Sequence, residues 1–186
     1  FSKKPVNSFA DYKGLKVRVT GMGGDVLSAV GASITNLPAT DVYMGLETGV
    51  IDAANWGGPS SQRSLGFHEI TDYILYPGVT GMGTVEIIAN KDAWNALPDD
   101  LKAIVETAAY SHVMSYGRWL LNDDKQALKE MVEAGQMEVC QIPPEEMAKI
   151  RDIAMDYMRE YSMTDDFAAE AFNKLESFLK QEGVVE

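Results

Sequence analysis

Short runs of alternating apolar and polar residues divide the first half of the chain into strands and helices. Three segments are rich in β-branched and apolar residues, which is typical of short strands. These segments are residues 16–20, 32–37 and 50–54. Helical spacing, an N-cap signal at Thr40-Asp41 and glycine stops predict short helices between them, near 26–30 and at 42–48. Strands that alternate with helices pair in parallel, so an α/β sheet is expected.

The second half has the three-and-four spacing of amphipathic helices. One apolar series predicts a helix from residue 99 to about 134, which Gly135 ends. Its members are Leu101, Ile104, Val105, Ala108, Ala109, His112, Val113, Tyr116 and Leu120. The remaining expected elements are a loop at 55–61, strands at 84–89 and 137–142, and helices at 143–161 and 165–181. The prediction is therefore α/β, with a parallel or mixed sheet in residues 1–98 and long helices packed on it in residues 99–186.

Composition limits the kinds of partner that the chain could bind. Acidic residues number 28 and basic residues 16, which gives a net charge of −12. A phosphate backbone needs a clustered basic face, so nucleic-acid binding is not expected. No apolar run is long enough to span a membrane, and the one cysteine belongs to no zinc pattern. Because the chain opens on Phe1, without Met or a signal region, a mature, cleaved or partial product is expected.

A glycine-rich turn follows the first strand. Gly21-Met22-Gly23-Gly24 stands where a dinucleotide-binding fingerprint would lie, but Val26 occupies the position of its third glycine. Asp52 lies too far along the chain to be the acid that binds a ribose. A turn that lets the backbone approach a small ligand fits better, as does a purely structural turn. An α/β enzyme or nucleotide-binding protein that uses this turn is the alternative function.

Two places near strand ends carry candidate binding residues. Arg18 lies in an otherwise apolar strand, just before the glycine turn, where ligands of open α/β sheets bind. Its guanidinium could hold a carboxylate through two parallel hydrogen bonds, or it could be a solvated edge arginine. Asn55 and Trp56 end the third strand. They could bind a ligand, or they could be a helix cap and a core tryptophan.

Residues for catalysis are not apparent. His68 and His112 are the only histidines, and they form no metal signature. His112 is expected to lie in the core, because it falls on the apolar face of the long helix. A G-x-S-x-G nucleophile motif is missing, and the Asp pairs fall at predicted helix ends and solvated faces. The chain is therefore not expected to be an enzyme.

Several motifs, in the same order, resemble those of the DctP-like solute-binding proteins that serve tripartite ATP-independent periplasmic (TRAP) transporters. Gly14-Leu15-Lys16-Val17-Arg18 resembles the strand that opens the second lobe of these proteins. The segment 42–53 is also similar to that family. The motifs that resemble its 2-oxoacid and lactate branch are Asn55-Trp56-Gly57-Gly58-Pro59, Leu65-Gly66-Phe67, Tyr76-Pro77-Gly78, and Asn90-Lys91 to Leu97-Pro98. The likeness covers residues 8–130 closely.

This resemblance implies a fold and a function. It implies a periplasmic-binding-protein-like lobe that captures a small 2-oxo or 2-hydroxy acid in the periplasm and delivers it to the TRAP membrane permease. Arg18 matches the arginine that pairs with the ligand carboxylate. Asn55 and Trp56 match an acid–Trp pair that helps hold a sodium or calcium ion beside the ligand.

Three departures from the family pattern change the expectation. Asn55 replaces the acid by a neutral amide, which weakens the case for the metal ion. Val79-Thr80-Gly81 stand where the branch has aromatic residues and an acid, which suggests a roomier pocket. Family members also begin with a whole first lobe, so this chain is expected to lack that lobe and to expose apolar surface. A homodimer through the helix at 99–134 is one way to cover this surface.

Overall fold

Five short strands form the centre of the computed structural model, which describes residues 1–79 and 87–185. Strands β1 (Lys16–Arg18), β2 (Ser33–Thr35) and β3 (Ala53–Ala54) pair in parallel in the order β2-β1-β3. Strands β4 (Tyr73–Leu75) and β5 (Glu138–Cys140) form a second parallel pair. The backbone of Ser2 joins the two sets through antiparallel bridges to Ala53 and Tyr73. The α/β class with parallel pairing is therefore confirmed.

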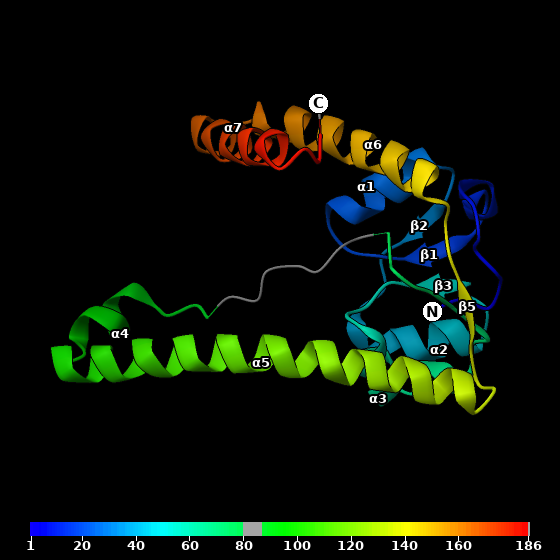
Figure 1. The fold of residues 1–186 in the computed structure, drawn as a ribbon, viewed down its shortest axis with the longest axis horizontal. Coiled ribbons are helices and arrows are strands. Elements are labelled where there is room, and N and C mark those ends of the chain that lie inside the picture. The colour runs from blue at the N-terminus through cyan, green and yellow to red at the C-terminus, as the bar shows by residue number, and fades with distance from the viewer. Residues whose placement is uncertain (80–86, 186) are drawn as a thin grey trace.

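Helices cover both faces of this sheet. Helices α1 (Met22–Ala29) and α6 (Pro144–Ser162) lie on one face, whereas α2 (Val42–Glu47), α3 (Pro59–Ser64) and the last turns of α5 (Asp99–Glu133) lie on the other (Figure 1). Helix α7 (Asp166–Gln181) folds back along α6. The remaining elements are α4 (Lys91–Ala96) and the 3-10 turns η1 (Phe9–Tyr12), η2 (Ala39–Asp41) and η3 (Phe67–Glu69).

Two hydrophobic cores lie on the two faces of the sheet. One, under α1 and α6, contains Val17, Leu27 and Ile150, and the other, under α2 and α5, contains Leu46, Ile51 and Met131. Each core includes side chains from before and after residue 98. The division into residues 1–98 and 99–186 stays a proposal, and the two parts share their cores.

The long helix was predicted with nearly correct ends, but the burial of its first half was not. The buried residues of α5 are Asp124, Ala127 and Met131, all in its last third. Figure 1 shows the first part of α5 extending away from the sheet together with α4. The expected core position of His112 is wrong, because this side chain is exposed and stacks on Tyr116 with ring centroids 5.6 Å apart. Helical spacing identifies an apolar face, but it does not show that another element covers that face.

Other differences from the sequence prediction concern short helices and one expected strand. The expected loop at 55–61 becomes α3 from Pro59 onward, with proline at the first helical position, where no N–H is needed. The glycine turn is shorter than expected, because Met22 to Gly24 already form the first turn of α1. Helix α4 was not predicted. The expected strand at 84–89 begins outside the described residues, and residues 87–89 belong to no strand. No helix in the described ranges combines the length and apolarity needed to cross a membrane.

Replacement of Leu46 by alanine is expected to destabilise the fold strongly. Leu46 is fully buried between α2 and the sheet, so its truncation should lower the free energy of unfolding by about 2–5 kcal/mol. Met44 lies on the same helix but is 55 % exposed, and Met44→Ala should change that energy by no more than about 0.5 kcal/mol. Urea unfolding followed by circular dichroism measures both. Equal losses for the two variants would contradict this description of the core.

Candidate functional site

The parallel register of the sheet brings Arg18, Asn55 and Trp56 to the same edge. Arg18 ends β1 and pairs with Ala54, the last residue of β3. The backbone N–H of Asn55 donates to the carbonyl oxygen of Arg18 at 2.8 Å, so the chain leaves both strands side by side. Val17 joins the core under α1, and strand alternation directs Arg18 to the opposite face. The three residues singled out in the sequence therefore lie together at the carboxyl edge of the sheet.

Two backbone carbonyls and one aromatic ring hold the guanidinium of Arg18. Its Nε donates to the carbonyl oxygen of Leu37 at 3.3 Å, and its Nη1 donates to that of Asn55 at 3.2 Å. The Cζ atom lies 4.7 Å from the ring centroid of Trp56, which is within the range of a cation–π contact. These partners follow the ends of β2 and β3, and the two hydrogen bonds use two of the five N–H donors of the side chain.

Arg18 is a buried cation, and only 8 % of the residue is exposed. Within residues 1–79 and 87–185 no carboxylate forms an ion pair with it. Burial lowers the pKa of the Arg18 guanidinium, but the group stays charged, because arginine is not deprotonated in proteins. The solvated edge arginine that the sequence left open is thus wrong. The site presents a fixed positive charge with donors to spare.

Asn55 and Trp56 differ in their surroundings. Trp56 is half-buried and packs against the core under α2 while it covers the Arg18 guanidinium. It is therefore part of the core and part of the site. Asn55 is exposed, and its backbone carbonyl serves Arg18. Its side chain offers an amide oxygen and an amide N–H₂ at the edge of the sheet.

Sequence reasoning missed the residues that support this edge. Leu37 contributes only its backbone carbonyl, and a backbone contact leaves no mark in the sequence. Gln62 of α3 donates to the carbonyl oxygen of Gly57 at 3.2 Å, and Asp124 of α5 contacts the start of the same helix. Asp124 lies 64 positions from Ser60 in the sequence, so no local motif records its contact.

The donor set among the described residues does not fit a firmly bound metal ion. No three His, Cys, Asp or Glu side chains in the described part of the chain are grouped so as to hold a metal ion. At the sheet edge Asn55 brings an amide oxygen in place of a carboxylate, and its carbonyl already accepts from Arg18. Hard cations prefer charged oxygen ligands, so these residues alone would hold calcium weakly. Residues 79–81 differ from the pattern of the resembled branch, but Thr80 and Gly81 lie outside the described residues.

The glycine turn opens a shallow hollow beside the site. It has a volume of about 410 Å³ and is lined by Val19, Thr20, Gly21, Gly24, Asp25, Ser28, Ile34 and Asn36. Asp52 lies at the other end of the sheet, where its N–H donates to Lys16 at the start of β1. Its carboxylate pairs with Lys4 at 3.1 Å. Asp52 is therefore not placed to bind a ribose beside the glycine turn.

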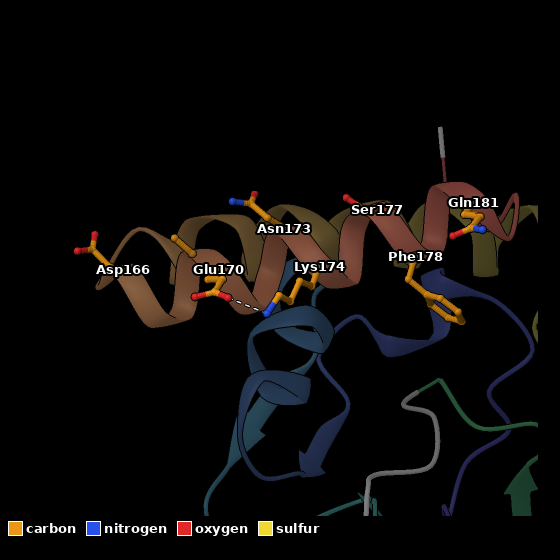
Figure 2. Close-up of a pocket in the computed structure, with 8 residues that line it drawn as sticks. Asp166, Glu170, Asn173, Lys174, Ser177, Phe178 and Gln181 are labelled. Atoms are coloured by element: carbon orange, nitrogen blue, oxygen red, sulfur yellow. Dashed lines mark hydrogen bonds and ion pairs between the residues drawn. The ribbon is translucent and has the colours of Figure 1, made fainter.

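A larger hollow, of about 640 Å³, lies along the outer face of α7 (Figure 2). All of its lining residues belong to that one helix, and Glu170 and Lys174 point toward each other across 2.6 Å. A ligand site needs polar groups that converge from several elements. This surface has none, so we place the site at the Arg18 edge.

Comparison with known proteins gives the family. The profile of the bacterial extracellular solute-binding proteins of family 7, DctP, matches residues 1–164. The chain belongs to this family. The family's proteins are periplasmic substrate-binding components of transporters and not enzymes, which confirms the resemblance to TRAP solute-binding proteins and the expectation that the chain is non-catalytic.

Individual relatives support the same assignment. The monocarboxylate 2-oxoacid-binding periplasmic protein of Nostoc sp. is 32 % identical over 96 % of this chain and 49 % of its own length. The TRAP solute-binding protein of Colwellia psychrerythraea with bound calcium and pyruvate is 30 % identical, with a TM-score of 0.80 over 97 % of this chain and 55 % of that one. The protein of Pseudoalteromonas atlantica with bound sodium and pyruvate is 29 % identical, with a TM-score of 0.77 over 97 % and 55 %. The DctP-family chain thus spans about half the length of these relatives.

Proposed function

We propose that this chain contributes the arginine edge of a binding site for a small organic carboxylate. The observation that carries the proposal is the Arg18 guanidinium, which is buried, positioned by two carbonyls and a ring, and without an anionic partner in the described residues. A buried charge is costly unless it is paired. A ligand carboxylate would supply that pair and could accept two parallel hydrogen bonds from the unused donors.

A 2-oxo or 2-hydroxy monocarboxylate is the ligand class that we favour. Support comes from the relatives, since one is named as a 2-oxoacid-binding protein and two hold pyruvate. The chain also places a polar residue at this edge, because Asn55 follows β3 beside the end of β1 and has an amide side chain. An oxo or hydroxyl group next to the carboxylate would match such a residue. The roomier pocket expected from segment 79–81 would admit an acid larger than pyruvate.

The role that follows is capture and delivery. As in its family, the protein would bind the acid in the periplasm and present it to the TRAP membrane permease.

The exposed first part of α5 would be covered by a second copy of the chain, since Ile104, Tyr110, Met114 and Trp119 are each more than half exposed. Large exposed apolar surfaces mark interaction sites.

Loss of the Arg18 guanidinium should weaken ligand binding. Arg18→Ala should raise the dissociation constants of pyruvate and lactate roughly 10- to 150-fold, because a hydrogen bond to a charged group contributes about 1.5–3 kcal/mol. Arg18→Lys should recover little of this, since lysine lacks the planar fork. Isothermal titration calorimetry measures the affinities, with the uncharged analogue lactamide as the ligand control.

Arg159 offers a matched control variant. It is also an arginine beside an aromatic ring, with Cζ 5.7 Å from the Phe172 centroid, but it joins α6 to α7 on the outer surface. Arg159→Ala should leave the pyruvate affinity unchanged. The proposal would be wrong if Arg18→Ala bound as tightly as the parent protein.

The affinity of the parent protein should depend little on cations. Because the residues at the edge include an amide rather than a carboxylate, chelation of calcium or replacement of sodium by choline should change the pyruvate affinity by less than about twofold. Asn55→Asp restores the charge and should make that affinity rise with calcium. Calorimetry in matched buffers tests both, and a strict calcium requirement of the parent would overturn the expectation.

Self-association should depend on α5. At micromolar concentration the 186-residue chain should sediment as a dimer, and Tyr110→Lys with Met114→Glu should give a monomer, because these residues lie on one helical face. Phe167→Lys on α7, at a residue 83 % exposed, should leave the dimer intact. Analytical ultracentrifugation distinguishes these outcomes. A monomeric parent chain would exclude the dimer.

A further inference from the structure

A buried carboxylate from the long helix touches the loop that carries Asn55 and Trp56. Asp124 of α5 is 7 % exposed, and its Oδ1 accepts hydrogen bonds from the backbone N–H of Ser60 at 2.9 Å and from the Ser60 hydroxyl at 2.6 Å. Ser60 is the second residue of α3, which begins three residues after Trp56. Asp124, which lies 64 positions away in the sequence, thus contacts the chain where the loop 55–58 leads into α3. We call this segment, residues 55–58, the ligand loop.

Asp124 takes the place of a missing helix cap. The first N–H groups of a helix lack partners within it, and the side chain of the N-cap residue usually accepts from the second or third. The N-cap of α3 is Gly58, which has no side chain, and the first helical residue is Pro59, which has no N–H. The Asp124 carboxylate accepts from the second residue instead. A negative charge there also complements the helix dipole.

The same contact explains why position 58 holds glycine. The backbone of Gly58 has φ −85° and ψ 178°, which any residue can adopt. A side chain is excluded by space, because a Cβ atom at Gly58 would lie 2.1 Å from Oδ2 of Asp124 and 2.5 Å from its Cγ. The carboxylate therefore lies directly against the loop backbone, two residues after Trp56.

We propose that Asp124 is a positioning residue that holds the loop 55–58, and with it Trp56 over Arg18, in the geometry that receives the ligand. The step from loop geometry to affinity rests on the proposed function. Gln62 holds the carbonyl of Gly57 from within α3, and Asp124 accepts hydrogen bonds from Ser60 and lies against the backbone of Gly58 from α5. Because the carbonyl of Asn55 is also a partner of Arg18, a shift of this loop alters two of the three contacts of the guanidinium.

The test measures the solvent exposure of Trp56 and the affinity for the ligand separately. In a background in which Trp94 and Trp119 are replaced by phenylalanine, Trp56 is the only tryptophan, and acrylamide quenching of its fluorescence reports its exposure without ligand. Asp124→Ala should increase this quenching and weaken pyruvate binding by about tenfold or more, the size expected for lost bonds to a charged group. Asp124→Asn should stay within about twofold of the parent in both, because its amide oxygen can still accept from Ser60.

A matched control breaks the other polar link between the same helices. Glu130 of α5 forms an ion pair with Arg63 of α3, and both side chains are more than 40 % exposed. Glu130→Ala should therefore change neither quenching nor affinity. Unchanged Trp56 quenching in folded Asp124→Ala would overturn the proposal. Changed quenching with a parent protein that binds neither pyruvate nor lactate would support the positioning role and reject the proposed function.

A second pair of variants, also in the single-tryptophan background, tests the same contact from the loop side. Gly58→Ala introduces the clash from the loop side, and it should increase Trp56 quenching when Asp124 is present. In combination with Asp124→Gly the clash is removed, so Gly58→Ala should have no further effect, which is the non-additivity expected of residues in contact. Equal effects of Gly58→Ala in the two backgrounds would show that Asp124 does not act on this loop.

Discussion

The buried guanidinium of Arg18 imposes the constraint on which the rest of the site depends. Removing a charge from water is costly, and the fold offsets the cost with carbonyl oxygens from Leu37 and Asn55 and with the ring of Trp56. These partners follow β2 and β3, the two strands on either side of β1. The arrangement works only if all three strands end at the same level. Parallel pairing provides that alignment, since the carboxyl ends of neighbouring strands share one edge.

The sequence predicted the parts of this site that depend on local pattern. The strand that ends in Arg18 shows in its β-branched residues, and the alternation of strands and helices implies the parallel order that brings Asn55 beside it. The burial of Arg18 was not predictable in this way. Two of its partners are backbone carbonyls, which any residue type provides, so the sequence left the buried and solvated alternatives equally open.

Helix α3 shows why non-local contacts limit such predictions. Gly57 and Gly58, which precede it, and Pro59, which begins it, are typical of a loop, and the N-cap Gly58 has no side chain that could cap the helix. The capping group comes from Asp124, which has no local feature that marks it. The opposite error occurred in α5, where His112 belongs to an apolar series but is exposed. A periodic pattern records which face of a helix is apolar, whereas burial depends on what packs against it.

The two parts of α5 therefore have different relations to the site. Residues 99–121 contain no buried side chain. Along α5 from this exposed end, Asp124 is the first described residue to form a hydrogen bond with the rest of the described structure. At 1.5 Å per residue, the helix rises about 35 Å between Leu101 and Asp124. Because a continuous helix moves nearly as a rigid rod, a partner that fixes its exposed part also fixes the direction from which Asp124 reaches Gly58. The geometry of the ligand loop is then determined from two sides, by the strand ends that hold Arg18 and by the helix that holds α3. A site built in this way is more rigid than its loop sequence suggests, since glycines at 57 and 58 would otherwise leave Trp56 free to move.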